Sequence, residues 1–191
     1  MNHPNIGSRV SPTRSFRLLT GVDDSGGVVN CAGVYAAGEV GDPGWFERGR
    51  LVGAAMTQRP ELFGVVSCAV PLLDMVRYHL FKVARFWVPE YGSAEDAAQL
   101  RNILSYSPYQ KVKDGVKYPA TILITGDADT RVDPLHARKM AARLQAATGS
   151  GRPVILHYDT EGGHTQGLPL GKRVANLADE LAFLTQQLGW E

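Results

Sequence analysis

Three continuous apolar runs of strand length predict buried β-strands. They are FGVVSCAV at 63–70, ATILITG at 120–126 and PVILHYD at 153–159. Runs without polar alternation are typical of strands covered on both faces, as in a parallel sheet. A further short strand is expected at 28–36, where the run VVNCAGVYA is mostly apolar.

Helices are expected between these strands, at 51–59, 93–104, 133–147 and 171–188. Ser93 and Asp96 have the spacing of a capping box at the start of the second helix. The last helix has a stripe of apolar residues at helical spacing, namely Val174, Leu177, Ala178, Leu181, Leu184 and Leu188. Strands that alternate with helices predict an α/β fold with a mostly parallel sheet flanked by helices.

The first 27 residues are rich in Gly, Pro, Ser, Asn and Arg and show little periodicity. We therefore expect a loose N-terminal arm at 1–27 and a single α/β domain at 28–191.

The composition is that of an ordinary globular protein, with 44% hydrophobic and 20% charged residues and a net charge of +1. The 20 Lys and Arg residues are spread along the chain, so no basic patch for nucleic acid or an anionic membrane is expected. No apolar stretch approaches the ~20 residues of a membrane span, and the N-terminus lacks an apolar signal region. These features favour a cytoplasmic protein, in which Cys31 and Cys68 are expected to be buried free thiols.

Two loops that follow predicted strands contain acid–base residues. DADTRVDP follows the strand at 120–126, and TEGGHTQG follows the strand at 153–159. An Asp on one such loop and a His on the next is the second half of a Ser–Asp–His relay in α/β-hydrolase order. An isolated Asp and an isolated His on loops are nevertheless common without any catalytic role, and the residues alone leave both interpretations open.

Residues 51–190 resemble the catalytic domain of the prolyl oligopeptidase family, whose members are serine peptidases that cleave after proline in short peptides. The matching blocks are LVGAAMTQRPELFG, LLDMVRYHLF, WVPEYG, YSPYQKVK, YPATILITGDADTRVDPLHARKM and EGGHTQG. The stretch GVYAAGEVGDPGWFERGR more weakly resembles the Gly-rich loop of the family and the turn after it. The resemblance implies an α/β-hydrolase fold and no cofactor. The sequence contains no HExxH or CxxC motif, so a metal site is not expected.

The resemblance also implies roles for individual residues. Asp129 matches the carboxylate of the relay, and His164 matches its base. The implied pocket for a proline-containing peptide consists of Trp87, Tyr91, Arg131 and Val132. Trp87 would stack on the proline ring and Arg131 would hold a substrate carbonyl. Without the resemblance, Trp87 and Tyr91 at i, i+4 would be interpreted as core packing.

The nucleophile of the family is absent from this sequence. In the family it lies in GGSNGG immediately before the LLVGA helix, whereas here WFERGR precedes LVGA. Neither Ser25 nor Ser67 has the strand–turn–helix context of a serine elbow. The segments that in the family supply an oxyanion-hole tyrosine and a β-propeller are also expected to be missing.

Two hypotheses follow. The first is a serine peptidase domain of the prolyl oligopeptidase type that is inactive as this chain. The second is a non-catalytic remnant or a module that binds proline-containing peptides. In either case the α/β-hydrolase fold is expected to be incomplete, and the strand at 28–36 could fill the position of the missing strand.

Overall fold

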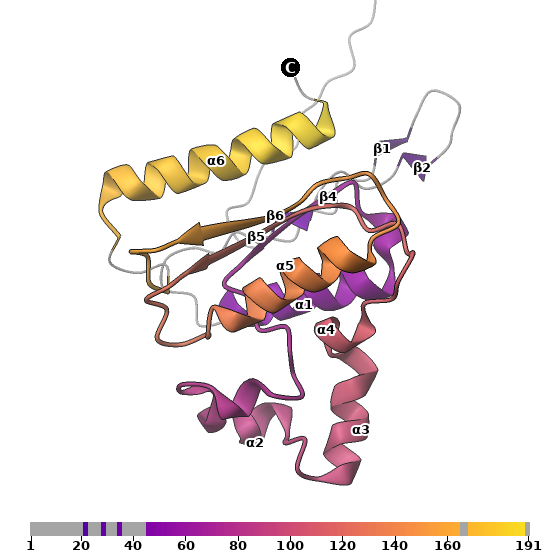
Figure 1. Ribbon diagram of the computed structural model, residues 1–191, viewed down its shortest axis with the longest axis vertical. Coiled ribbons are helices and arrows are strands. Elements are labelled where there is room, and N and C mark those ends of the chain that lie inside the picture. The colour runs from indigo at the N-terminus through magenta and orange to yellow at the C-terminus, as the bar shows by residue number, and fades with distance from the viewer. Residues whose placement is uncertain (1–20, 23–27, 30–33, 36–44, 165–167, 190–191) are drawn as a thin grey trace, which may run out of the picture.

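A parallel β-sheet lies between helices that cover its two faces (Figure 1). The computed structural model describes residues 21–22, 28–29, 34–35, 45–164 and 168–189. The strands of the sheet, in spatial order, are β3 (Val34–Tyr35), β4 (Val65–Ala69), β5 (Ala120–Gly126) and β6 (Val154–Asp159). The predicted strands 63–70, 120–126 and 153–159 are confirmed, with small shifts at their ends.

The helices follow the predicted order, with additional short elements between them. The α-helices are α1 (Trp45–Gln58), α2 (Val88–Tyr91), α3 (Ala97–Tyr106), α4 (Pro108–Lys111), α5 (Leu135–Ala147) and α6 (Leu170–Leu188). The 3₁₀ helices are η1 (Pro60–Leu62), η2 (Tyr78–Leu80) and η3 (Ala84–Trp87). The four predicted helices are confirmed, although α1 begins six residues before the expected start at Leu51.

The prediction of a single strand at 28–36 is wrong. Val28–Val29 forms β2, which pairs antiparallel with β1 (Gly21–Val22) in a separate two-stranded sheet. Only Val34–Tyr35 joins the main sheet, as β3. In the sequence, Asn30 and Gly33 lie between the two apolar pairs, and both residue types are depleted in strands.

β3, the part of this segment that joins the main sheet, lies beside β4. Val34 pairs in parallel with Val66, and Tyr35 pairs with Ser67. The other edge of β4 pairs along its length with β5, from Val65 opposite Ala120 to Ala69 opposite Ile124. β4 therefore has strands on both sides, although β3 covers only part of one edge.

Alternate residues of the strands face different helices, as the continuous apolar runs predicted. Leu123 packs with buried residues of α1 and α5 on one face. Its neighbours Ile122 and Ile124 pack with Phe183 and Leu184 of α6 on the other face. Figure 1 shows α6 on the opposite side of the sheet from α1 and α5.

The cap of α3 differs from the predicted capping box. Asp96 is the N-cap residue, and its Oδ1 accepts hydrogen bonds from the N–H groups of Ala98 (3.0 Å) and Gln99 (2.8 Å). The Ser93 hydroxyl instead accepts from the N–H of Glu95 in the preceding turn. The helix therefore starts at Ala97, four residues after Ser93, because the aspartate satisfies the first free amides.

Candidate active site

The loops that follow β5 and β6 are held together by backbone hydrogen bonds. The N–H of Asp127 donates to the carbonyl of Asp159 (2.8 Å), and the N–H of Ala128 donates to the carbonyl of Gly162 (2.9 Å). A Cβ atom at Gly126 would lie 2.2 Å from the Gly162 oxygen, a distance that no side chain tolerates. Glycine at 126 is therefore required for this approach.

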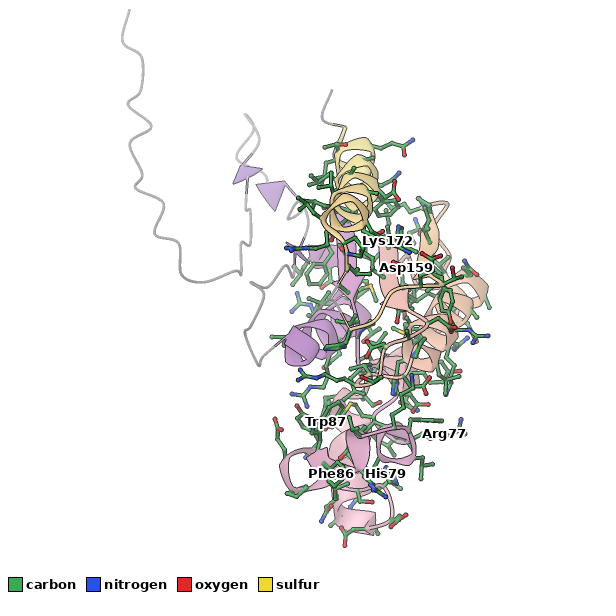
Figure 2. All side chains as sticks on the ribbon, turned by 90° about the vertical axis from the view of Figure 1, so that its left-hand side faces the viewer. Arg77, His79, Phe86, Trp87, Asp159 and Lys172 are labelled. Atoms are coloured by element: carbon green, nitrogen blue, oxygen red, sulfur yellow. The ribbon has the colours of Figure 1, made fainter. Side chains whose placement is uncertain are left out.

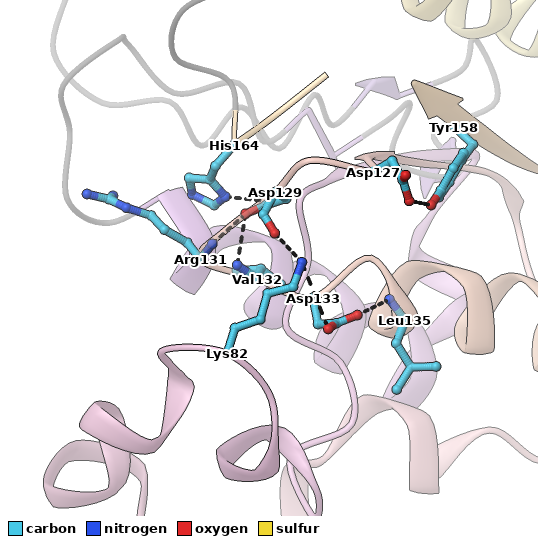
Figure 3. A network of polar contacts seen from close by, with 9 residues as sticks. All are labelled: Lys82, Asp127, Asp129, Arg131, Val132, Asp133, Leu135, Tyr158 and His164. Carbon is cyan, nitrogen blue, oxygen red and sulfur yellow. Dashed lines mark hydrogen bonds and ion pairs between the residues drawn. The ribbon is translucent and has the colours of Figure 1, made fainter. Parts of the chain in front are cut away.

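The approach of the two loops brings Asp129 and His164 into hydrogen-bond contact. Nδ1 of His164 lies 2.7 Å from Oδ2 of Asp129 (Figure 3). The Asp129 side chain is fully buried, and that of His164 is only 10% exposed. Because a carboxylate can only accept, Nδ1 carries the proton and Nε2 has the lone pair in the neutral ring. The predicted proximity of these two residues is confirmed.

The other oxygen of Asp129 is fixed by the backbone of its own loop. Oδ1 accepts hydrogen bonds from the N–H groups of Arg131 (2.8 Å) and Val132 (3.0 Å). Both carboxylate oxygens are thus engaged, and the group cannot rotate without breaking these bonds. The arrangement presents the carboxylate to His164 in one orientation.

Asp159 shapes the loop that leads to His164. Its Oδ1 accepts from the N–H groups of Glu161 (3.0 Å) and Gly162 (2.9 Å), and it lies 2.7 Å from Nζ of Lys172 on α6 (Figure 2). Burial of Asp159 raises its pKa, but the bonds from Lys172 and the two amides outweigh this effect and lower the pKa to about 2. No role for Asp159 was predicted from the sequence. The Asp-Thr-Glu-Gly spacing of an Asx-type turn was the feature that could have identified it.

Three of the four residues predicted to form the peptide pocket share one apolar cluster. Tyr91 and Val132 are buried members of the cluster, and Trp87 is a partly buried side chain that packs against it. The other buried members are Leu72, Met75, Tyr78, Ala84 and Ile103. Core packing, the alternative given for Trp87 and Tyr91, therefore describes Tyr91, which is 8% exposed, whereas Trp87 is only partly buried. Val132 is also buried, at 2% exposed.

Arg131, the fourth predicted pocket residue, is not part of this cluster. Its backbone N–H contacts Asp129, and its side chain is exposed and extends away from the carboxylate (Figure 3). Arg131 is thus on the same loop as Asp129 and precedes the buried Val132 in the sequence.

Residues 40–191 match the model of the prolyl oligopeptidase family. This chain belongs to the prolyl oligopeptidase family. It is 42% identical over 142 residues to the prolyl endopeptidase of Elizabethkingia meningoseptica, covering 74% of this chain and 20% of that protein. It is 36% identical over 143 residues to the prolyl endopeptidase of Dictyostelium discoideum, covering 73% of this chain and 19% of that protein. The chain therefore spans about a fifth of the length of these relatives.

Solved structures of the family confirm the α/β-hydrolase fold. A prolyl endopeptidase structure superposes with a TM-score of 0.73 at 48% sequence identity, over 75% of this chain and 21% of that chain. Prolyl oligopeptidase B from Galerina marginata, solved with a 35-residue peptide substrate, gives a TM-score of 0.70 at 28% identity, over 75% of this chain and 20% of that chain.

The segment before Leu51 has a different structure from the serine elbow expected in a prolyl oligopeptidase. The helix α1 runs without interruption from Trp45 to Gln58, so WFERGR is helical and contains no strand-to-helix turn. No contact of Arg50 in this segment was predicted from the sequence. Its guanidinium lies over the ring of Tyr91, 4.2 Å from the centroid, in cation–π geometry.

The described residues of β4 do not offer a substitute nucleophile for this prolyl oligopeptidase chain. Ser67 is buried, and its hydroxyl donates to the carboxylate of Glu180 on α6. Cys68 is a buried free thiol whose Sγ donates to the carbonyl of Gly49 (3.3 Å). Burial raises the pKa of the Cys68 thiol to about 12, so it is not a thiolate at neutral pH. Ser25 and Cys31 lie outside the described residues.

The remaining described histidines have structural contacts. Nδ1 of His136 accepts from the N–H of Asp74 (3.1 Å), and burial lowers the pKa of His136 to about 4. His157 lies 3.1 Å from Asp179, and His79 lies 3.7 Å from Glu95. Among the described residues, no group of three or more His, Cys, Asp or Glu side chains could hold a metal ion. Within the same part of the chain, no helix is long and apolar enough to cross a membrane.

Proposed function

We propose that Asp129 and His164 are the carboxylate and base of a prolyl-oligopeptidase-type relay, next to a pocket for proline-containing peptides. The observation that carries the proposal is the 2.7 Å hydrogen bond between His164 Nδ1 and a fully buried Asp129. A buried carboxylate on Nδ1 fixes the tautomer in which Nε2 accepts a proton, and it stabilises the imidazolium that forms.

The proposed ligand site comprises Trp87, Tyr91, Arg131 and Val132. The apolar cluster that joins three of these residues supports a surface for a flat pyrrolidine ring. The exposed Arg131 guanidinium supplies donors for a peptide carbonyl.

We further propose that this chain does not hydrolyse peptides. The relay needs a nucleophile at the start of the helix that contains Leu51, and that position is occupied by the helical segment WFERGR. Without a serine no acyl-enzyme forms, whatever the state of the Asp129–His164 pair. Binding of proline-containing peptides is then the activity that the chain retains, and this is the second candidate function.

The free Cys68 thiol favours a reducing compartment, and we propose the cytoplasm.

A fluorophosphonate probe tests the loss of hydrolysis. Chain 1–191 should remain unlabelled, whereas a full-length prolyl endopeptidase treated in parallel should be labelled at its serine. Covalent labelling of any serine of this chain would contradict the proposal.

Titration with a proline-containing peptide, followed by NMR, tests the binding site. Chemical shift changes should concentrate at Trp87, Tyr91 and Val132 and should be absent with the same peptide carrying glycine instead of proline. Trp87→Ala should abolish these changes. Phe86→Ala is the matched control, because Phe86 is the exposed neighbour of Trp87 and is not assigned to the pocket. Equal shifts with both peptides would overturn the proposed specificity.

A further inference from the structure

Lys82 connects the segment that contains Trp87 to the loop that contains Asp129. It lies between η2 and η3, and its Nζ donates a hydrogen bond to the backbone carbonyl of Asp129 (Figure 3). The same Nζ lies 3.9 Å from Oδ2 of Asp133. One ammonium group therefore contacts the Asp129 loop at two points.

The backbone of Lys82 is in an unfavourable conformation. Its φ angle is +50°, in the left-handed region that residues with a Cβ atom rarely adopt. Such a conformation persists where the surrounding contacts hold it in place. The bond to Asp129 is a contact that the Lys82 side chain makes from this conformation.

Asp129 is consequently anchored from two directions. Its carbonyl accepts from Lys82, and its carboxylate accepts from His164 and from the amides of Arg131 and Val132. The carbonyl and the carboxylate belong to one residue, so a shift of the backbone at this carbonyl changes the direction in which the carboxylate points.

We propose that Lys82 is a positioning residue that fixes the Asp129 carboxylate relative to His164 and links it to the segment with the peptide-pocket residues. The inference rests on the proposed function, because it assigns Lys82 a role in that relay. The alternative is that Lys82 makes only a partly exposed ion pair with Asp133, which contributes little to structure or stability.

The experiment compares Lys82→Met, Lys82→Arg and Asp133→Asn by amide hydrogen exchange and by the low-field proton resonance of His164 Nδ1. In Lys82→Met the Arg131 and Val132 amides should exchange roughly tenfold faster, as expected when a charge-assisted hydrogen bond is lost. The His164 Nδ1 proton signal should broaden or shift. The amide of Leu123 in the core of β5 is the internal reference and should keep its rate.

The conservative variants separate positioning from a surface ion pair. Lys82→Arg should restore the parental exchange rates and the His164 signal, because a guanidinium can still donate to the Asp129 carbonyl. Asp133→Asn removes the ion pair but retains an acceptor for the Leu135 N–H that Asp133 now holds at 2.9 Å, and should behave like the parent. Lys117→Met removes one charge from an exposed position and serves as the charge control.

Three results would overturn the inference: parental rates in Lys82→Met, an equal increase at Leu123, or an effect of Asp133→Asn as large as that of Lys82→Met. These readouts need neither turnover nor a bound peptide. A failure of the proposed peptide binding or an unexpected labelled serine is therefore distinguishable from a failure of the Lys82 inference.

Discussion

Oδ2 of Asp129 lies 2.7 Å from Nδ1 of His164 although the two residues are 35 positions apart in the sequence. They belong to loops that leave adjacent parallel strands, β5 and β6, at the same edge of the sheet. The contact depends on the packing of two backbone segments rather than on a local motif.

Replacement of Asp129 should destabilise the fold. Asp129→Ala leaves the N–H groups of Arg131 and Val132 and the imidazole of His164 without their buried acceptor. We expect a loss of about 3 kcal/mol in the free energy of unfolding, measured by urea denaturation. Asp127→Ala, on the same loop but exposed, should cost less than about 1 kcal/mol. Similar losses in both variants would contradict the assigned burial of Asp129.

Replacement of Gly126 should separate the two loops. In Gly126→Ala the new methyl group meets the Gly162 carbonyl at 2.2 Å, so the loops must move apart. We expect destabilisation of about 1–3 kcal/mol together with a changed His164 imidazole signal in NMR spectra. Gly151→Ala is the matched control, because a Cβ at that position meets no atom within 4 Å. An unchanged His164 signal in Gly126→Ala would show that this glycine does not set the approach of the loops.

The Asp159 carboxylate should make stability depend on pH in the acid range. Its pKa is about 2 in the folded chain, against about 3.9 in an unfolded chain, so the folded state binds the proton less readily. The contribution of the Asp159 carboxylate to the free energy of unfolding is complete above about pH 4 and is lost as the pH falls towards 2. The contribution should be on the order of 1 kcal/mol, because Lys172 is partly exposed and water screens the pair.

Unfolding measurements between pH 2 and pH 6 on the parent and on Asp159→Asn check this prediction. The difference between them should shrink as the pH falls through this window. Asp114→Asn, which removes an exposed ion pair with Arg143, is the control and should show little difference. A constant difference for Asp159→Asn across the range would refute the assigned ionisation.

Cys68 should be unreactive in the folded protein. Burial raises the pKa of its thiol to about 12, and the side chain has almost no exposed surface. Iodoacetamide at pH 8 should therefore leave Cys68 unmodified under native conditions and modify it fully in 6 M guanidinium chloride, as followed by peptide mass spectrometry. Rapid native modification of Cys68 would mean that β4 opens readily from the sheet.

Residue types and the local pattern in the sequence were sufficient to predict the main strands and the helices. They also placed Asp129 and His164, in that order, on loops that follow two of these strands. Continuous apolar runs predict strands such as 120–126 because both faces of a parallel strand are buried. The pattern did not predict that Val28–Val29 and Val34–Tyr35 are two short strands in different sheets, since the partner of a strand is not encoded in its own apolar content. The start of α3 was also not fixed by the residue types, because both Ser93 and Asp96 are acceptable caps and the structure uses Asp96.

The geometry of the candidate site was decided by the tertiary structure. The sequence contains Asp129, His164 and Lys82, but only the packing of β5 against β6 and of the η2–η3 segment against the Asp129 loop brings their polar atoms together. These contacts join residues far apart along the chain, and their distances depend on close backbone approaches such as that of Gly126 to Gly162. The missing serine elbow, in contrast, was evident from the sequence alone, because a nucleophile requires a particular residue type at one position and no folding of WFERGR can provide it.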